Sequence, residues 1–544
     1  MGAPRSGSST PRPRSPATSG PTPCLHSQAQ GYRRRTDPMA PTLYTSTVST
    51  LAFATFATVA IAQEADFPSL QMQGVEPIEI EVDIEGATER LSRAVQFPTI
   101  SNQDRNDFNT KAFDDYHAFL VEAYPNVHRV LKREVLGDPR PYSLLYTWEG
   151  KNPDLPPALF YAHQDVVPVP QDSLDQWQQE PFSGAVADGY IWGRGVLDDK
   201  NQIHGILEAA EMKIAEGWQP ERTLYFVFGQ DEEVGGPEGA RYVADVLEDR
   251  GIERFAFVMD ESAPLVPGIF PGLPDNTALI GIAQKGYLSL ELAIHALGGH
   301  SSQPPEESNI GILAEAITKL EDAQFPYRIH PALRAQYRYL GPELDEARQP
   351  VYAAVAFGKE GEMTDLEQAF IEEMASNQVT RAMLHTTIAV TMFNAGIKDN
   401  VLPPAATAVV NFRPMPGDTP EVIIDHVRKA IDDDRITVRD ISASTPATAM
   451  ADPEGPGYKA LEKTIHQIWG NDLVVAPFFV IGGSDSKHFQ ARPFAPDVYT
   501  ITGIQLESMK EFEGFHGVNE RIPVDEYAKT IAFFYQLMDN LDDL

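Results

Sequence analysis

Three short apolar runs constrain the fold of this chain more than any other feature of its sequence. They lie at residues 158–162, 224–228 and 255–259, are apolar on both faces and are rich in aromatic and branched side chains. Such runs are typical of central strands in a largely parallel sheet, because helices cover both faces of that kind of sheet. Helical apolar patterns at 201–216 and 239–249 separate the runs. The sequence therefore predicts an α/β domain with helices on both faces.

The middle of the chain predicts a second architecture. Residues 286–296 alternate apolar and polar side chains, which indicates an antiparallel strand with one exposed face. Further strands of this type are expected at 386–393, 407–413 and 435–438, with helices near 309–322 and 420–432. This β-α-β-β-α-β order is that of a ferredoxin-like unit.

We expect this unit to form an inserted α+β lid or dimerisation domain at 286–446. A segment of mixed composition at 324–384 interrupts it and is expected to enlarge it. The catalytic domain would then have two parts, at 63–285 and 447–544.

The first 62 residues are expected to lie outside the fold. Residues 1–38 are rich in Pro, Ser, Thr and Gly and carry six arginines against one aspartate, which predicts a disordered leader. Met39 is an alternative start. Residues 39–62 contain no charged side chain and end in Ala60-Ile61-Ala62, the small-residue pattern of a signal peptidase site. We therefore expect export to the periplasm or the medium after cleavage at Ala62; the alternative is an N-terminal membrane anchor.

Composition limits the chemistry that is available. The 78 Asp and Glu residues outnumber the 43 Lys and Arg residues and give a net charge of −35, which disfavours binding to nucleic acids. The only cysteine is Cys24, so cysteine-based zinc sites, iron–sulfur clusters and thiol catalysis are excluded. Any bound metal ion must therefore be held by His, Asp and Glu.

Acidic and imidazole side chains follow the predicted strands. Because ligands gather beyond the carboxyl ends of parallel strands, these residues are expected to meet at one edge of the sheet. The candidate metal ligands are His163, Asp198, Glu233, Asp260 and His516. Imidazole and carboxylate groups suit a divalent ion, and one shared carboxylate can bridge two ions about 3.5–4 Å apart.

Two neighbours of these ligands suggest supporting roles. Asp165 lies two residues after His163, where it could accept the second ring N–H of that histidine. Adjacent Glu232 and Glu233 cannot both bind one ion from a regular backbone, so one of them is free to act as a general base. Each of these residues is ordinary by itself on an acidic surface. Only their grouping after four predicted strands indicates a metal site.

The same residues belong to an ordered series of motifs. These motifs are His163-x-Asp165, Gly193-x-Gly195-x-x-Asp198-Asp199-Lys200, Asp231-Glu232-Glu233, Asp260-Glu261, Gly298-Gly299-His300, Asp399-Asn400, Asn411-x-Arg413, Gly482-Gly483-Ser484-Asp485 and Phe515-His516-Gly517-x-Asn519-Glu520. Over about residues 75–540 the series resembles the zinc metallopeptidase family of aminoacylase, glutamate carboxypeptidase and succinyl-diaminopimelate desuccinylase. The similarity is greatest to the branch that contains carboxypeptidase S and the secreted N-fatty-acyl-amino-acid hydrolase/synthase.

The resemblance implies two zinc ions per chain, which cobalt or manganese could replace. It implies that Asp198 bridges the ions, that His163 and Asp260 complete one site, and that Glu233 and His516 complete the other. Glu232 would be the general base toward a water between the metals. The Asp198–Asp199 peptide is expected to be cis.

The resemblance also implies substrate contacts. His300 would stabilise the tetrahedral intermediate, Asn400 and Arg413 would bind the free α-carboxylate of the substrate, and Gly483 would approach the substrate from its loop. A homodimer through the inserted domain is the expected assembly. The long 324–384 segment leaves open whether His300 acts in its own chain or in a partner. The implied reaction is hydrolysis of an amide bond next to a carboxylate, in a peptide or an N-acyl amino acid.

Two rival interpretations remain at this stage. Ser484 and Lys487 fit the S-x-x-K pattern of a serine hydrolase, although its companion motifs S-D-N and K-T-G are absent. The second rival is a secreted metal-binding or ligand-binding protein on the same scaffold without catalysis. Such a protein would be expected to lack Glu232 or one of the ligands, and this sequence has them all.

Overall fold

A computed structural model describes residues 67–269, 272–442 and 444–544. The predicted leader and signal peptide at 1–62 lie outside these described residues.

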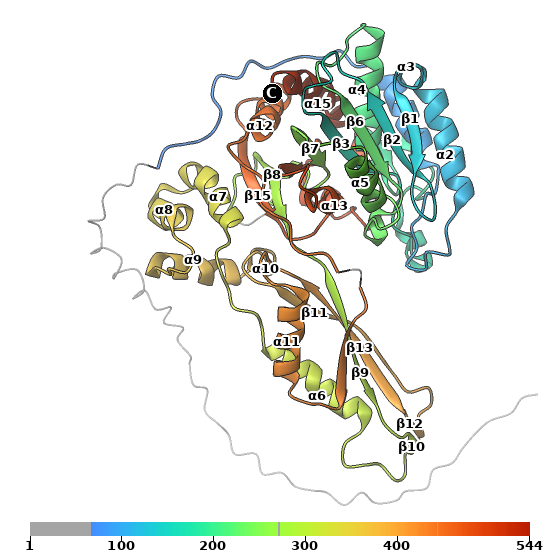
Figure 1. Cartoon of the computed structure of the whole chain (residues 1–544), viewed down its shortest axis with the longest axis vertical. Helices are drawn as coiled ribbons and strands as arrows, with labels where there is room; N and C mark the ends of the chain where they lie inside the picture. Colours follow the sequence, from blue (N-terminus) through green and yellow to red (C-terminus); the bar gives the residue numbers. More distant parts are fainter. Residues whose placement is uncertain (1–66, 270–271, 443) are drawn as a thin grey trace, which may run out of the picture. The chain divides into compact units, whose positions relative to one another are not determined.

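An eight-stranded mixed sheet forms the centre of the larger domain (Figure 1). In sheet order its strands are β1 (Lys132–Leu136), β2 (Ser143–Trp148), β6 (Leu224–Gly229), β3 (Ala158–His163), β7 (Phe257–Asp260), β16 (Val498–Thr500), β8 (Thr277–Gln284) and β15 (Val474–Val480). The neighbours from β6 to β16 are parallel, as are β8 and β15. The three apolar runs therefore form the central parallel strands, as predicted.

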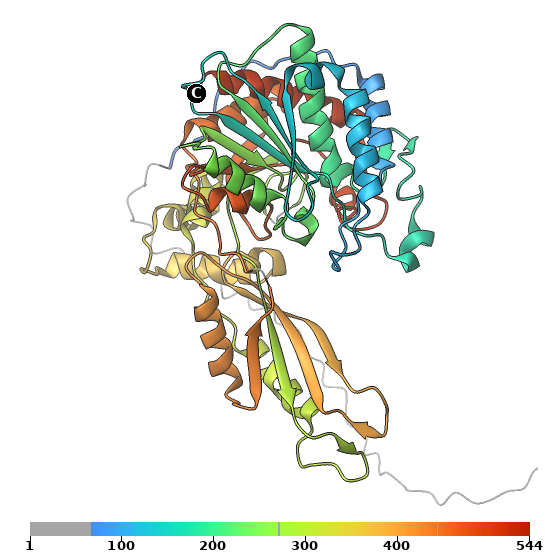
Figure 2. The same cartoon turned by 45° about the vertical axis from the view of Figure 1, so that its right-hand side comes forward.

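Helices cover both faces of this sheet (Figure 2). Successive residues of a strand point to opposite faces, so neighbouring residues of β3 belong to different cores. Phe160 belongs to a core shared with α1 (Ile84–Val95), α4 (Asn201–Ala215), α12 (Pro456–Trp469) and α15 (Val524–Asp542). Its neighbour Tyr161 belongs to a second core with α5 (Ala240–Asp249) and α13 (Ser486–Gln490). The predicted α/β class is confirmed. Among the described helices, none is both long and apolar enough to cross a membrane.

The inserted domain has the predicted ferredoxin-like topology. Its antiparallel sheet has the order β11 (Thr387–Ala395), β13 (Ala405–Arg413), β9 (Leu288–His295) and β14 (Ile436–Asp440). The helices α6 (Asn309–Asp322) and α11 (Pro420–Ile431) pack with the sheet in one apolar cluster. Beyond β9 and β11, β10 (Gly299–His300) pairs with β12 (Val401–Leu402).

The helices of the 324–384 segment do not belong to the inserted domain, which corrects our expectation. They are α7 (Pro331–Leu340), α8 (Gln349–Phe357), α9 (Asp365–Ala375) and α10 (Gln378–Ala382). Leu333, Leu340 and Phe370 are buried in the core of the eight-stranded sheet. The physical reason is that edge strand β15 needs an apolar cover, and α7 packs against it (Figure 1). This segment therefore extends the larger domain.

Candidate metal centre

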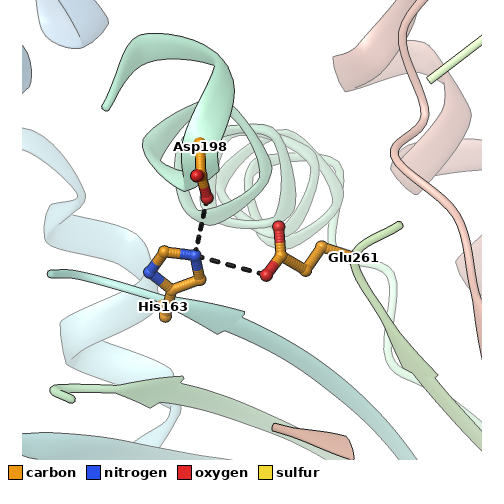
Figure 3. A group of neighbouring side chains, drawn as sticks. All are labelled: His163, Asp198 and Glu261. Atoms are coloured by element: carbon orange, nitrogen blue, oxygen red, sulfur yellow. Dashed lines mark hydrogen bonds and ion pairs between the residues drawn. The ribbon is translucent and has the colours of Figure 1, made fainter. Parts of the chain in front are cut away.

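Loops at the carboxyl edge of the eight-stranded sheet bring together two overlapping sets of side chains that could hold metal ions. His163, at the end of β3, forms the first set with Asp198 and Glu261 (Figure 3). Asp198 also belongs to the second set, with Glu233 and His516. Within each set the ligand atoms lie within 4.8 Å of one another. Asp198 is thus shared between two candidate sites.

Each oxygen of Asp198 faces a different imidazole. Oδ1 is 2.9 Å from Nε2 of His163, which in turn is 3.4 Å from Oε1 of Glu261 (Figure 3). Oδ2 is 2.7 Å from Nε2 of His516, which is 3.3 Å from Oε2 of Glu233. This geometry suits a carboxylate that bridges two ions. The peptide between Asp198 and Asp199 is cis, as expected.

Glu261, and not Asp260, completes the first set. The two carboxylate oxygens of Asp260 accept backbone N–H groups of Glu261 at 2.8 Å and of Ser486 at 2.7 Å. Asp260 therefore anchors the loop after β7, while the next side chain reaches His163. The geometry therefore favours Glu261 over the predicted Asp260 as the candidate ligand. The sequence signal was the Asp260-Glu261 pair itself, in which either carboxylate could have been the ligand.

Asp165 supports both sides of the site. Nδ1 of His163 lies 2.9 Å from the backbone carbonyl of Asp165 and 3.4 Å from its carboxylate, which leaves Nε2 directed at Asp198. The carboxylate of Asp165 also accepts the backbone N–H groups of Glu232 and Glu233, each at 3.1 Å. Asp165 thus orients the histidine and the pair of glutamates together.

The Glu232 side chain lies near the candidate ligands but belongs to neither set. Within the described part of the chain it accepts no hydrogen bond, although its charge interacts with those of His163, Glu261 and Lys487. Burial, and then the negative charge of Asp485, raise the pKa of Glu232 well above its ordinary value. A carboxylate in this position has the freedom that a proton-transfer group needs.

The donor set fits divalent metal ions. Burial raises the pKa of Glu261 to about 7, and burial together with Asp198 raises the pKa of Glu233 to about 8. Although burial opposes it, the two imidazoles hold the pKa of Asp198 below its usual value. Ionisation of all three carboxyl groups would place more negative charge in the cluster than its two imidazoles offset, and divalent cations would supply the missing positive charge.

The predicted substrate-binding residues fall into two places. Arg413 ends β13, and its strand neighbour Phe412 pairs with Leu288 at the start of β9. His300 and Asn400 lie beyond the opposite end of β9, exposed at the β10–β12 pair. They make no contact with the metal-binding sets among the described residues. Gly483 is exposed after β15 and lies close to the side chain of Gln284.

Arg413 has an unusual environment for a cation in so acidic a chain. Its guanidinium lies 5.0 Å from the centre of the Tyr287 ring, and its charge interacts with that of Glu232. Within the described residues no carboxylate lies within ion-pair distance of it. Arg439, on the same sheet, instead pairs with Glu291 at 2.8 Å. Arg413 is therefore a half-buried cation available to an anionic ligand.

The serine hydrolase alternative finds no support in the geometry. Ser484 Oγ lies 2.8 Å from Ser486 Oγ and accepts a hydrogen bond from Gln284. Lys487 Nζ lies 3.6 Å from Asp485. Among the described residues no hydrogen bond joins the Ser484 hydroxyl to Lys487 Nζ, so the lysine is not placed to activate the hydroxyl.

A largely parallel sheet that carries two overlapping His–carboxylate sets at its carboxyl edge defines a candidate dinuclear metallohydrolase. The model of peptidase family M20/M25/M40 matches residues 159–540. The chain therefore belongs to this family and is a hydrolase, which confirms the family resemblance seen in the sequence.

Individual relatives agree with this placement. The chain is 36% identical over 464 residues to "Probable carboxypeptidase S-like 2" of Dictyostelium discoideum, which covers 85% of this chain and 86% of the relative. It is 34% identical over 457 residues to the N-fatty-acyl-amino acid synthase/hydrolase PM20D1 of Xenopus tropicalis, covering 84% and 85%. The M20 family metallo-carboxypeptidase Sso-CP2 of Sulfolobus solfataricus superposes with a TM-score of 0.62 at 18% identity, covering 84% of this chain and 99% of that one. This last likeness concerns the fold alone.

Proposed function

We propose that the protein is a di-zinc hydrolase that cleaves an amide bond next to a free α-carboxylate. The substrate would be a peptide, as for a carboxypeptidase, or an N-acyl amino acid. The observation that carries the proposal is Asp198, with one oxygen toward each imidazole and the free Glu232 side chain nearby. The names of the relatives, carboxypeptidase S-like and N-fatty-acyl-amino acid synthase/hydrolase, support the same substrate class.

The proposed ligands divide between two ions. Asp198 would serve both, with His163 and Glu261 on one side and Glu233 and His516 on the other. Zinc ions bound there, or cobalt or manganese in their place, would polarise the scissile carbonyl and lower the pKa of the attacking water.

The side chains of the protein would move the proton and hold the substrate. Glu232 would take the proton from the attacking water and deliver it to the leaving amine nitrogen. Asp165 would keep Glu232 in place through the backbone N–H that it accepts. Arg413 would bind the free carboxylate, for which a guanidinium fork is well matched. Gly483 would contact the substrate from its loop.

His300 and Asn400 would contribute from a second copy of the chain. They lie at the far end of the sheet from Arg413, so we propose that the inserted domain forms a homodimer that brings them to the partner's site. The exposed Met392 and Phe393 on edge strand β11 are suitable residues for such an interface. In this arrangement His300 would stabilise the tetrahedral intermediate.

A substrate panel tests the proposed reaction. Peptides and N-acyl amino acids are offered to the zinc-loaded enzyme, each with a free carboxylate and as the matching carboxamide. We expect release of the amine product only from the carboxylates, with activity lost on chelation and restored by zinc or cobalt. A protein that binds two ions and turns over no member of the panel would instead support the non-catalytic alternative.

We also propose export after cleavage at Ala62. The small-residue pattern at 60–62 supports this. Intact-mass measurement of the native protein should give a chain that begins near Gln63. A chain that retains residues 48–62 and is recovered from a membrane fraction would contradict cleavage and favour the anchor.

A further inference from the structure

A buried ion pair joins the two loops that carry Asp198 and His516, and the proposed reaction makes no use of it. Arg194 Nη1 donates to Glu520 Oε2 at 2.6 Å. Both side chains are buried, with exposed fractions of 2% and 0%. A buried charge pair is costly unless its remaining hydrogen-bonding capacity is used, so the other partners of this pair are informative.

Both carboxylate oxygens of Glu520 accept hydrogen bonds from the backbone that leads into Asp198, the proposed bridging ligand. Oε2 also accepts the N–H of Gly195 at 3.0 Å. Oε1 accepts the N–H groups of Leu197 at 2.9 Å and of Asp198 at 3.2 Å. One carboxylate therefore fixes the orientation of three peptide groups immediately before the Asp198 side chain.

Arg194 makes the matching contact on the other loop. Its Nη2 donates to the carbonyl of Gly517, the residue after His516, at 2.6 Å. His516 and Asn519 have φ angles of 56° and 62°. Side chains disfavour this left-handed conformation, so the loop depends on contacts from outside to keep it. The backbone N–H of Gly193 also donates to the carbonyl of Glu520 at 2.9 Å.

We infer that Arg194 and Glu520 are positioning residues that hold Asp198 and His516 in register. The inference rests on the proposed dinuclear site. The second set contains both supported residues, Asp198 and His516. The first set contains only one of them, Asp198, and its His163 is held by β3 and by the backbone carbonyl of Asp165. Loss of the pair should therefore weaken the ion at the Asp198–Glu233–His516 set more than the ion at the other set.

Glu520→Gln tests this inference, because the amide keeps the shape of the side chain but replaces one acceptor oxygen by a donor. Glu367→Gln is the matched control. The Glu367 side chain is likewise 0% exposed. It accepts hydrogen bonds from Arg334 Nη1 at 2.8 Å and from the backbone N–H of Thr364 at 2.9 Å. It lies in the helical segment at 331–382, away from the candidate ligands.

Metal-free protein is titrated with Zn²⁺ by calorimetry. We expect two ions on the wild type and on Glu367→Gln with equal affinities. On Glu520→Gln we expect the second ion to bind at least about tenfold more weakly and the first to change little, in the range found when residues behind metal ligands are altered. Equal weakening of both ions, or unchanged affinities, would overturn the inference.

Hydrogen–deuterium exchange on the metal-free proteins supplies a readout that does not depend on metal. Peptides that cover 194–198 should exchange faster in Glu520→Gln and at the wild-type rate in Glu367→Gln; unchanged exchange would overturn the inference. If Glu520→Gln does not fold, Arg194→Lys replaces it, because lysine keeps the charge but cannot reach both Glu520 and Gly517. A wild type that binds one ion would contradict the proposed dinuclear site, and exchange would still decide the role of Glu520.

Discussion

Glu232→Gln is expected to lower kcat by about 10²- to 10⁴-fold while the protein still binds two metal ions. The amide cannot take a proton from the attacking water, and it has nearly the size of the carboxylate. Because Glu232 belongs to neither metal-binding set, the ligands should keep their places. Steady-state kinetics on the best substrate of the panel and metal analysis of the same preparation measure the two quantities.

Two variants make this result specific. Glu261→Gln alters a residue of the first set and should lower the metal content as well as the rate. Glu367→Gln, in the distant helical segment, should leave both unchanged. If Glu232→Gln kept wild-type turnover, another group would be the base. If it lost one ion, Glu232 would be part of the metal site and its proposed role would be wrong.

The architecture was predictable from hydrophobic pattern. The runs at 158–162, 224–228 and 255–259 are apolar on both faces because β3, β6 and β7 lie between two helical layers. The alternation at 286–296 reflects a sheet with helices on one face only. The segment 324–384 was misplaced, because the apolar face of a helix shows that it is buried and not which core it joins.

Most residues of the candidate metal centre were also predictable from the sequence. The motifs named His163, Asp198, Glu233 and His516, which the structure gathers into two sets. They did not separate Asp260 from Glu261, because the choice depends on which carboxylate the backbone N–H groups of the loop occupy. The motifs included Glu520 without assigning it a role, and its pairing with Arg194 was not predicted, since the contacts of this pair go mainly to backbone groups.

The spatial separation of the substrate residues could not be read from motifs either. Arg413 and His300 lie at opposite ends of the strands of the inserted domain. The length of β9, eight residues, corresponds to about 26 Å of extended chain. A single copy of the inserted domain therefore presents Arg413 and His300 to different places, which is the physical basis for proposing a partner.

Arg413→Ala is expected to lower kcat/KM by about 100-fold or more for substrates with a free carboxylate. The guanidinium is half-buried and has no described carboxylate partner, so a substrate carboxylate would be its ion-pair partner. A 100-fold loss corresponds to about 2.7 kcal/mol of transition-state stabilisation. This lies within the range for a hydrogen-bonded charge pair in a poorly hydrated site, and above that of an exposed pair.

The matching carboxamides separate binding of the carboxylate from a structural role. The wild type should process them poorly, and Arg413→Ala should change their kcat/KM much less, because they lack the charge that Arg413 is proposed to bind. Arg439→Ala is the control on the same sheet, since Arg439 is already paired with Glu291, and it should leave both substrate series unchanged. Equal losses on acids and amides in Arg413→Ala would show that Arg413 supports the fold of the inserted domain, and that preference for a free carboxylate has another origin.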